Sequence, residues 1–345
     1  MRRRVLLGLL AAGLCACAGR NAPSAATVTA SASPRGGEIV ELPADIVAGR
    51  VFVRPVTADG HTLRFFTDSG GGSQFVFPDT VKRLGWITRP GPAGDSDLDD
   101  GAPPSLVAIP AWREGQGIPP ALATHQRKEL RTHYIVIPRD AFFDAEFDGF
   151  LGQGWFGGRV WTIDYPRGKF LHRVDGSVPV HDARDRVPMH LPMAADGQPE
   201  RAFGRIAITV DGTSLDMLLD TGATLVATPA AARALGDEAT LRRGTSFVEK
   251  SIFDGWRKRH PEWRVIERAE QKLGSPILEV PAVTVGGHTV GPVWFTSRED
   301  HNFRDYMSSM TDAPIVGALG GSALKYFRVT LDYPHGLALF QRDAG

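Results

Sequence analysis

Short apolar runs separated by glycine, proline and aspartate turns follow one another along most of this chain. β-branched and aromatic residues are frequent in these runs, which predicts short β-strands joined by tight turns. Two segments depart from this pattern. Residues 88–120 are rich in Gly, Pro and Asp, which predicts a long loop, and residues 247–273 are charged and contain tryptophans, which predicts one or two surface helices.

One stretch of the pattern occurs twice, as FFTDSGGGSQFVFP at 65–78 and as MLLDTGATLVATP at 217–229. Each copy follows a strand-like run that contains an Asp-Gly pair, which predicts a hairpin turn. Each copy also leads into a short helical pattern that ends in Leu-Gly. The paired segments are Asp59-Gly60 with Asp211-Gly212, and 81–85 with 231–236.

A second pair of blocks follows downstream, at 147–171 and 314–340. Both blocks contain an apolar run, a glycine turn and a strand that ends in Asp-Tyr-Pro. Matched blocks in the same order predict two homologous lobes, residues 38–178 and 185–345. We therefore expect an all-β fold of two barrel-like or sandwich-like lobes with a cleft between them and few short helices.

The first residues have the layout of an export signal. Arg2, Arg3 and Arg4 precede an apolar stretch that ends in Leu14-Cys15-Ala16-Cys17. This ending resembles a bacterial lipobox, which predicts a signal peptide over 1–17 and a lipid on Cys17; the alternative is a plain secretory signal. Residues 18–37 predict a disordered tether. We expect an exported protein, lipid-anchored in the cell envelope and facing the periplasm, and Ala18 favours the outer membrane.

Composition argues against nucleic-acid binding, a membrane-spanning helix, cysteine chemistry and a zinc site. The 345 residues carry 39 Lys+Arg and 39 Asp+Glu, which does not favour a nucleic-acid partner. No later apolar stretch approaches the roughly 18 residues of a spanning helix. The only cysteines are Cys15 and Cys17, so the body has no thiolate nucleophile or cysteine metal site. Histidine spacing suits no zinc site, and we predict no metal and no cofactor.

The repeat predicts a catalytic role for the two aspartates. Asp68 and Asp220 occupy matching positions at the ends of apolar strands, and equivalent residues of two pseudo-symmetric lobes meet at the axis between them. Two adjacent carboxyl groups share a proton, so one can act as a base toward water and the other as an acid. Neighbours that support this pair are Ser69 and Thr221, which can brace it, and Gly70 and Gly222, which allow tight loops.

The blocks resemble the aspartic proteases of the pepsin and retropepsin type. The residues that carry the resemblance are Phe65-Phe66-Thr67-Asp68-Ser69-Gly70 with Phe150-Leu151-Gly152, and Leu218-Leu219-Asp220-Thr221-Gly222 with Ile315-Val316-Gly317. The resemblance spans nearly all of 45–342. It implies pepsin/retropepsin-like β-barrel lobes and hydrolysis of a peptide or protein substrate by a water activated between the two aspartates. One chain supplies both lobes, so a monomer suffices for the site.

The chain also departs from that family. Thr67 stands where an apolar residue is usual, and no Tyr-Gly flap motif occurs between residues 80 and 145. A flap could lie within 88–118 or near 243–268. Ala223 after the second motif implies a less acidic optimum than that of pepsin-like enzymes. Two alternatives stay open: an envelope lipoprotein that binds peptides or another ligand without cutting them, and a structural lipoprotein whose aspartates are distant or solvated.

A further pattern, G-x-G-x-x-G at 152–157, matches a dinucleotide-binding loop. It lacks the surrounding βαβ unit, so it does not predict nucleotide binding.

Overall fold

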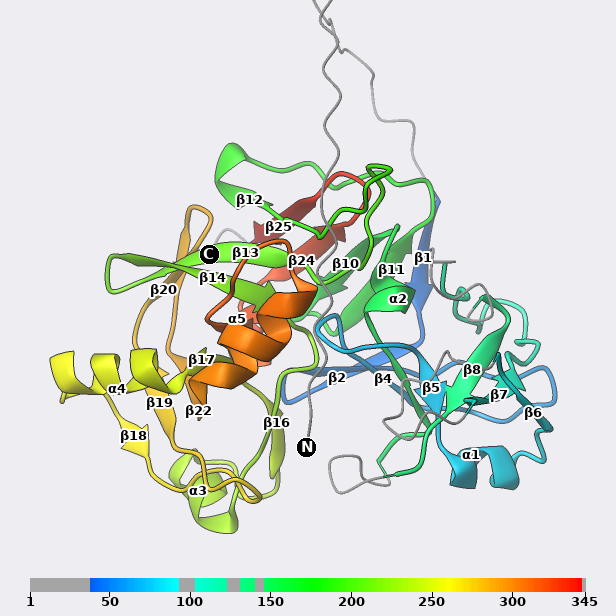
Figure 1. Ribbon diagram of the computed structural model, residues 1–345, viewed down its shortest axis with the longest axis horizontal. Helices are drawn as coiled ribbons and strands as arrows, with labels where there is room; N and C mark the ends of the chain where they lie inside the picture. Colours follow the sequence, from blue (N-terminus) through cyan, green and yellow to red (C-terminus); the bar gives the residue numbers. More distant parts are fainter. Residues whose placement is uncertain (1–37, 93–102, 123–130, 140–145, 343–345) are drawn as a thin grey trace, which may run out of the picture. The chain divides into compact units, whose positions relative to one another are not determined.

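The computed structural model describes residues 38–92, 103–122, 131–139 and 146–342, and this part of the chain is mostly β with few helices (Figure 1). The signal peptide, Cys17 and the tether over 18–37 lie outside the described residues. Among the helices that the structure describes, none is long and apolar enough to cross a membrane.

A six-stranded antiparallel sheet joins strands from both halves of the chain (Figure 1). Its centre is the pair of strands that end in the two Asp-Tyr-Pro blocks. There Thr162 lies opposite Thr330, and their hydroxyl groups are 2.8 Å apart. In spatial order, the strands are β1 (Ile39–Leu42), β11 (Lys169–Arg173), β10 (Val160–Asp164), β24 (Arg328–Asp332), β25 (Leu337–Gln341) and β12 (Arg186–Pro188).

An eight-stranded sheet is built from the first half of the chain. Its order is β2 (Ala44–Val47), β3 (Arg50–Val53), β4 (Phe65–Thr67), β9 (Gly149–Leu151), β5 (Phe75–Val76), β8 (His133–Val136), β7 (Ser105–Ala108) and β6 (Thr88–Pro90). The antiparallel pair β6 and β7 lies within the segment expected to be a long loop, so that expectation is wrong for the described residues.

A nine-stranded sheet is built from the second half. Its order is β18 (Val265–Ile266), β19 (Ile277–Val280), β22 (Val293–Arg298), β17 (Ser246–Glu249), β23 (Gly317–Leu319), β14 (Thr213–Leu219), β13 (Arg205–Val210), β20 (Val283–Val285) and β21 (His288–Val290). A separate two-stranded sheet pairs β15 (Thr224–Val226) with β16 (Arg242–Gly244).

Neither large sheet closes into a barrel within the described residues, so the expected barrel lobes are not confirmed there. The first sheet ends at β2 and β6, and the second ends at β18 and β21. The strands that end in the Asp-Tyr-Pro blocks pair with each other in the shared six-stranded sheet, and they do not return to either large sheet.

The helices are short. They are α1 (Pro78–Arg83), α2 (Gln153–Phe156), α3 (Pro229–Ala234), α4 (Lys250–Arg259) and α5 (Gly321–Leu324), with 3-10 turns η2 (Ala183–Asp185) and η4 (Met307–Met310) and a π-helical turn η3 (Asn302–Tyr306). Helix α4 confirms a surface helix within 247–273. Trp256 fixes it to the sheet, because its buried ring lies 5.3 Å from the Phe295 ring and 6.4 Å from the Trp263 ring.

The predicted turn at Asp211-Gly212 joins β13 and β14 as a two-residue hairpin, because Val210 pairs with Thr213. Both turn residues have positive φ, +50° and +71°, as a turn that matches strand twist requires. This hairpin leads directly into the strand that ends at Asp220, so local turn chemistry helps to set the position of the second aspartate.

Candidate active site

Asp68 and Asp220 occupy equivalent places in the two large sheets. Asp68 follows β4, and its backbone N–H donates to the carbonyl oxygen of Leu151 at 2.9 Å. Asp220 follows β14, and its N–H donates to the carbonyl oxygen of Leu319 at 3.0 Å. In both places a parallel strand, β9 or β23, runs beside the aspartate strand. Each aspartate backbone is therefore held in the same way.

Four hydrogen bonds connect the two aspartate loops. The Ser69 hydroxyl donates to the Leu219 carbonyl oxygen at 2.7 Å and accepts from the Thr221 N–H at 3.0 Å. The Thr221 hydroxyl donates to the Thr67 carbonyl oxygen at 3.3 Å and accepts from the Ser69 N–H at 3.1 Å. Both hydroxyl residues are buried. This reciprocal bracing, which we call the grip, is the role predicted for Ser69 and Thr221.

The two carboxyl groups lie together, each against the glycine of the opposite loop. A Cβ on Gly70 would lie 2.6 Å from the carboxyl carbon of Asp220, and a Cβ on Gly222 would lie 2.0 Å from that of Asp68. Each glycine N–H donates to the aspartate of its own loop, at 2.9 Å to Asp68 and 2.8 Å to Asp220. Only glycine leaves room for this approach.

Burial and proximity change the titration of the pair. Burial raises the pKa of Asp68 well above its usual range, and the charge of Asp220 and the hydrogen bond between the two groups raise it further. Burial also raises the pKa of Asp220, although hydrogen bonds from Asp68 and from the Gly222 and Ala223 backbone oppose that increase. Both shifts favour one proton held by the pair, and the two groups titrate as a unit.

The aspartates line a cavity of about 240 Å³. Aromatic rings form much of its wall, from Phe66, Phe147, Phe150 and Phe247. Sequence reasoning missed two cations that also line it, Arg50 and Arg242. Arg50 is buried, lies 4.9 Å from the centre of the Phe66 ring and pairs with Glu146 at 2.7 Å. The sequence did offer one signal for Arg50, because this residue starts the strand that precedes the Asp68 block.

Two buried tyrosines were also missed. Tyr165 and Tyr333 belong to the repeated Asp-Tyr-Pro blocks, and both are buried. Burial raises the pKa of each phenol, and the charge of Asp220 raises that of Tyr165 while the charge of Asp68 raises that of Tyr333. Each neutral phenol is therefore within electrostatic range of the aspartate of the opposite half. The repetition of Asp-Tyr-Pro was the signal for these positions.

The second apolar-apolar-Gly segment lies three residues later than expected. Strand β14 pairs in parallel with β23, which places Ala318-Leu319-Gly320 where Phe150-Leu151-Gly152 stands in the first half. The expected Ile315-Val316-Gly317 precedes it. Ile315 is fully buried in the same apolar cluster as Ala318, so local hydrophobicity could not separate the two choices.

The two halves also differ after the aspartate loops. In the first half, β5 follows the loop directly and pairs antiparallel with β9. In the second half, β17 has the equivalent pairing with β23, and the segment from β15 through α3 to β16 comes before it. Helix α4 after β17 is therefore the counterpart of α1, and the sequence match between 81–85 and 231–236 does not identify equivalent helices.

The predicted flap has no assigned residue. The β6–β7 hairpin falls within 88–118, but residues 93–102 between its strands lie outside the described part of the chain. Among the described residues, no residue of β6 or β7 lines the dyad cavity.

The structural-lipoprotein alternative expected distant or solvated aspartates, and the close pair of a half-buried Asp68 and a buried Asp220 does not match it. The described residues contain no group of three or more His, Cys, Asp or Glu side chains placed to hold a metal ion.

No protein-family model matches the chain, and no curated protein matches it significantly.

Proposed function

We propose that this protein is an aspartic endopeptidase whose catalytic residues are Asp68 and Asp220. The observation that carries the proposal is the reciprocal placement of the two carboxyl groups, each against the glycine of the opposite loop. Two acids held this close share one proton, which supplies a base and an acid in one site. Resemblance to pepsin- and retropepsin-type proteases supports the same conclusion. The substrate would be a peptide or protein segment bound in extended form along the cavity.

The reaction follows from a dyad in which one carboxyl group is ionised and the other is protonated. The ionised carboxylate of the pair takes a proton from a water molecule, and the water oxygen attacks the carbonyl carbon of the peptide bond. The protonated carboxyl group of the pair donates its proton to the carbonyl oxygen, which gives a neutral tetrahedral diol. In the second step the carboxyl group that took the water's proton passes it to the amide nitrogen, the carbon–nitrogen bond breaks, and a diol hydroxyl returns its proton to the other carboxylate, so the dyad again holds one proton. The products are a carboxylic acid and an amine.

The supporting residues keep the two acids in place through these steps. The grip prevents the two loops from separating, and the N–H groups of Gly70 and Gly222 orient the carboxyl oxygens. Positioning of this kind contributes to catalysis because reacting groups that are already aligned lose little entropy in the transition state.

Cleavage of a diverse peptide mixture from about pH 3 to 8 tests the proposal. We expect cleavage that a statine-type inhibitor blocks and that Asp68→Asn and Asp220→Asn each abolish. Asp45→Asn is the matched control, because that carboxylate lies on β2 and pairs with Arg54 at 3.0 Å. Cleavage that survives both dyad substitutions would show that the dyad assignment is wrong.

A binding protein without catalysis is the second candidate. The observation that favours it is the absence of β6–β7 residues from the cavity wall within the described part of the chain. Peptides that bind at every pH and are never cut would support this candidate over the peptidase.

We also propose that the protein acts in the cell envelope, anchored through a lipid on Cys17. Radiolabelled palmitate should enter the full-length protein in a bacterial host and should not enter Cys17→Ser. Equal labelling of both proteins would contradict the anchor.

A further inference from the structure

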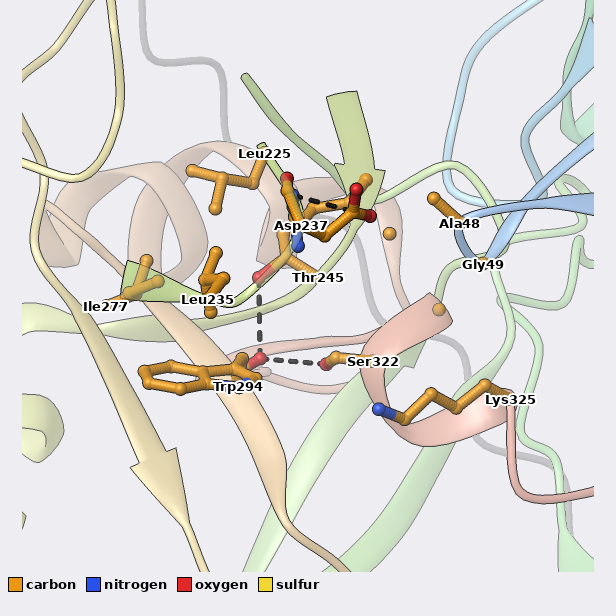
Figure 2. Close-up of a pocket in the computed structure, with 13 residues that line it drawn as sticks. Ala48, Gly49, Leu225, Leu235, Asp237, Thr245, Ile277, Trp294, Ser322 and Lys325 are labelled. Atoms are coloured by element: carbon orange, nitrogen blue, oxygen red, sulfur yellow. Dashed lines mark hydrogen bonds and ion pairs between the residues drawn. The ribbon is translucent and has the colours of Figure 1, made fainter. Parts of the chain in front are cut away.

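A second pocket of about 290 Å³ lies apart from the dyad cavity and shares none of its lining residues (Figure 2). Most of its wall comes from the second half of the chain. Ala48 and Gly49, in the turn between β2 and β3, complete it, and the backbone N–H of Gly244 donates to the Ala48 carbonyl oxygen at 2.7 Å. The pocket is thus built from parts of the chain that are far apart in sequence.

One side of the pocket is apolar. Figure 2 shows Leu225, Leu235, Ile277 and Trp294 gathered on the side away from Ala48 and Gly49. The Trp294 backbone is fixed, because its carbonyl oxygen accepts hydrogen bonds from the Ser322 hydroxyl at 2.8 Å and the Thr245 hydroxyl at 3.4 Å. This wall is preformed, and it suits a small branched or aromatic group.

The rest of the pocket carries two cations. Arg243 lies on β16, and Lys325 extends from the end of α5 toward Ser322 (Figure 2). The Arg243 guanidinium donates to the carbonyl oxygen of Asp237 at 3.0 Å, and the Asp237 carboxylate is 3.9 Å away. Within the described residues, the buried Nε–H of Arg243 has no hydrogen-bond partner. One hydrogen-bond donor on the polar side of the pocket is therefore left for a ligand.

The electrostatics agree with this geometry. Burial lowers the pKa of the Arg243 guanidinium, which the charge of Asp237 opposes. Burial lowers the pKa of the Lys325 ammonium, which Glu279 opposes and the charge of Arg243 lowers further. Two cations that repel each other beside a low-polarity wall favour an anionic ligand between them.

The hairpin of β15 and β16 separates this pocket from the dyad cavity. Alternate side chains of a strand point to opposite faces. Thr224, Val226 and Arg242 line the dyad cavity, whereas Leu225 and Arg243 line the second pocket. A ligand in the second pocket therefore leaves the space beside the aspartates open.

We propose that this second pocket binds a small monocarboxylate that carries a branched or aromatic apolar group. The carboxylate lies between Arg243 and Lys325, and the apolar group packs against Leu225, Leu235 and Trp294. The cavity volume of about 290 Å³ fits one such group. A free organic acid and the C-terminal residue of a peptide share this chemistry. The proposal does not depend on peptidase activity.

Calorimetric titration of the full-length protein tests it. The probes are isovalerate for a free acid and acetyl-glycyl-leucine for a peptide terminus, each beside its neutral amide. We expect the carboxylates to bind at least about tenfold more tightly than the amides, a difference of about 1.4 kcal/mol. Binding of isovalerate alone supports the pocket as a site for free acids, and binding of the peptide probe supports a site for chain ends. Asp68→Asn should bind the probes as the unaltered protein does.

Three variants make the test specific. Lys325→Gln should weaken carboxylate binding about tenfold, and Lys258→Gln, which removes an exposed cation from α4, should not change it. Asp237→Asn should strengthen carboxylate binding about threefold by removing a competing carboxylate, a gain that misfolding cannot produce. Equal binding of acids and amides, no effect of Lys325→Gln, or no carboxylate binding up to about 10 mM would each overturn the proposal.

Discussion

Removal of one hydroxyl from the grip should loosen the dyad and destabilise the whole protein. Ser69→Ala deletes the oxygen that donates to the Leu219 carbonyl oxygen and accepts from the Thr221 N–H. Both backbone partners are in buried residues, and Ser69 is fully buried, so water cannot replace the lost oxygen without opening the structure. The substitution therefore leaves one donor and one acceptor unsatisfied between the two loops.

The size of the effect follows from these two groups. A buried polar group left without a partner costs about 1–3 kcal/mol, so Ser69→Ala should lower the free energy of unfolding by about 2–6 kcal/mol. Denaturant sensitivity for a chain of this length is at least about 3 kcal/mol per M urea. The transition midpoint should thus fall by up to about 0.7–2 M urea.

Urea unfolding followed by tryptophan fluorescence measures the midpoint, and peptide cleavage measures the dyad. Ser69→Thr is the matched control, because it keeps the hydroxyl and the equivalent position already holds Thr221. Thr330→Val is a second control: it breaks the buried hydroxyl pair with Thr162 in the shared sheet. Thr330→Val should lower the free energy of unfolding and leave the pH dependence of cleavage unchanged. Ser69→Ala should lower both the free energy of unfolding and kcat.

The double variant Ser69→Ala/Thr221→Val tests whether the bonds of the grip are lost together. Thr221→Val removes the other two bonds of the grip, so the two losses would simply add if the loops stayed in place. We expect a combined loss smaller than the sum, because loops that have already separated lose the remaining bonds together. A Ser69→Ala midpoint equal to that of the unaltered protein would refute the view that the grip holds the halves together.

Three other changes probe the dyad. Asp68→Asn should raise the free energy of unfolding at pH 7 but not at pH 3. The reason is that a carboxyl group whose pKa is raised in the folded protein destabilises the fold as the pH rises above about 4. Thermal unfolding at both pH values tests this, and equal changes in unfolding temperature at the two pH values would contradict it. Gly222→Ala should abolish cleavage, because the added methyl group would displace the Asp68 carboxyl group. Gly72→Ala is the control and should retain cleavage, because a Cβ there meets no atom within 4 Å. Cleavage retained by Gly222→Ala would argue against the close packing of Gly222 on Asp68. The pH–rate profile should peak above pH 4, because Ala223 offers no side-chain hydrogen bond to the dyad; an optimum well below pH 4 would contradict this.

Sequence reasoning could find the two aspartates because the signal repeats. The blocks around Asp68 and Asp220 carry the same order of apolar, acidic, hydroxyl and glycine residues, and that order alone identified the grip partners Ser69 and Thr221. Turn chemistry was equally local. The Asp211-Gly212 pair predicted its hairpin because few other residues accept positive φ at both positions.

The remaining features depend on pairing between distant strands. The runs at Phe75–Val76 and Thr224–Val226 look alike locally, yet only the first pairs with the strand behind its aspartate. Strand preference reflects packing partners more than intrinsic propensity, so one sequence could not reveal the exchange of β15 for β17. The shift to Ala318-Leu319-Gly320 has the same cause, since both candidate segments are apolar and end in glycine. Barrel closure likewise depended on which strands paired across the halves.

The segment from β15 through α3 to β16 has no counterpart between the Asp68 loop and β5, a stretch that the structure describes in full. In a dimer made by one gene, each mutation appears in both subunits, so an added hairpin would stand on both sides of the axis. A single chain that carries both aspartate loops is free of that constraint. Selection could then add a wall beside Asp220 while the loop around Asp68 stayed short. Mutations in this wall can alter one side of the site at a time, so substrate preference can evolve with the grip left unchanged.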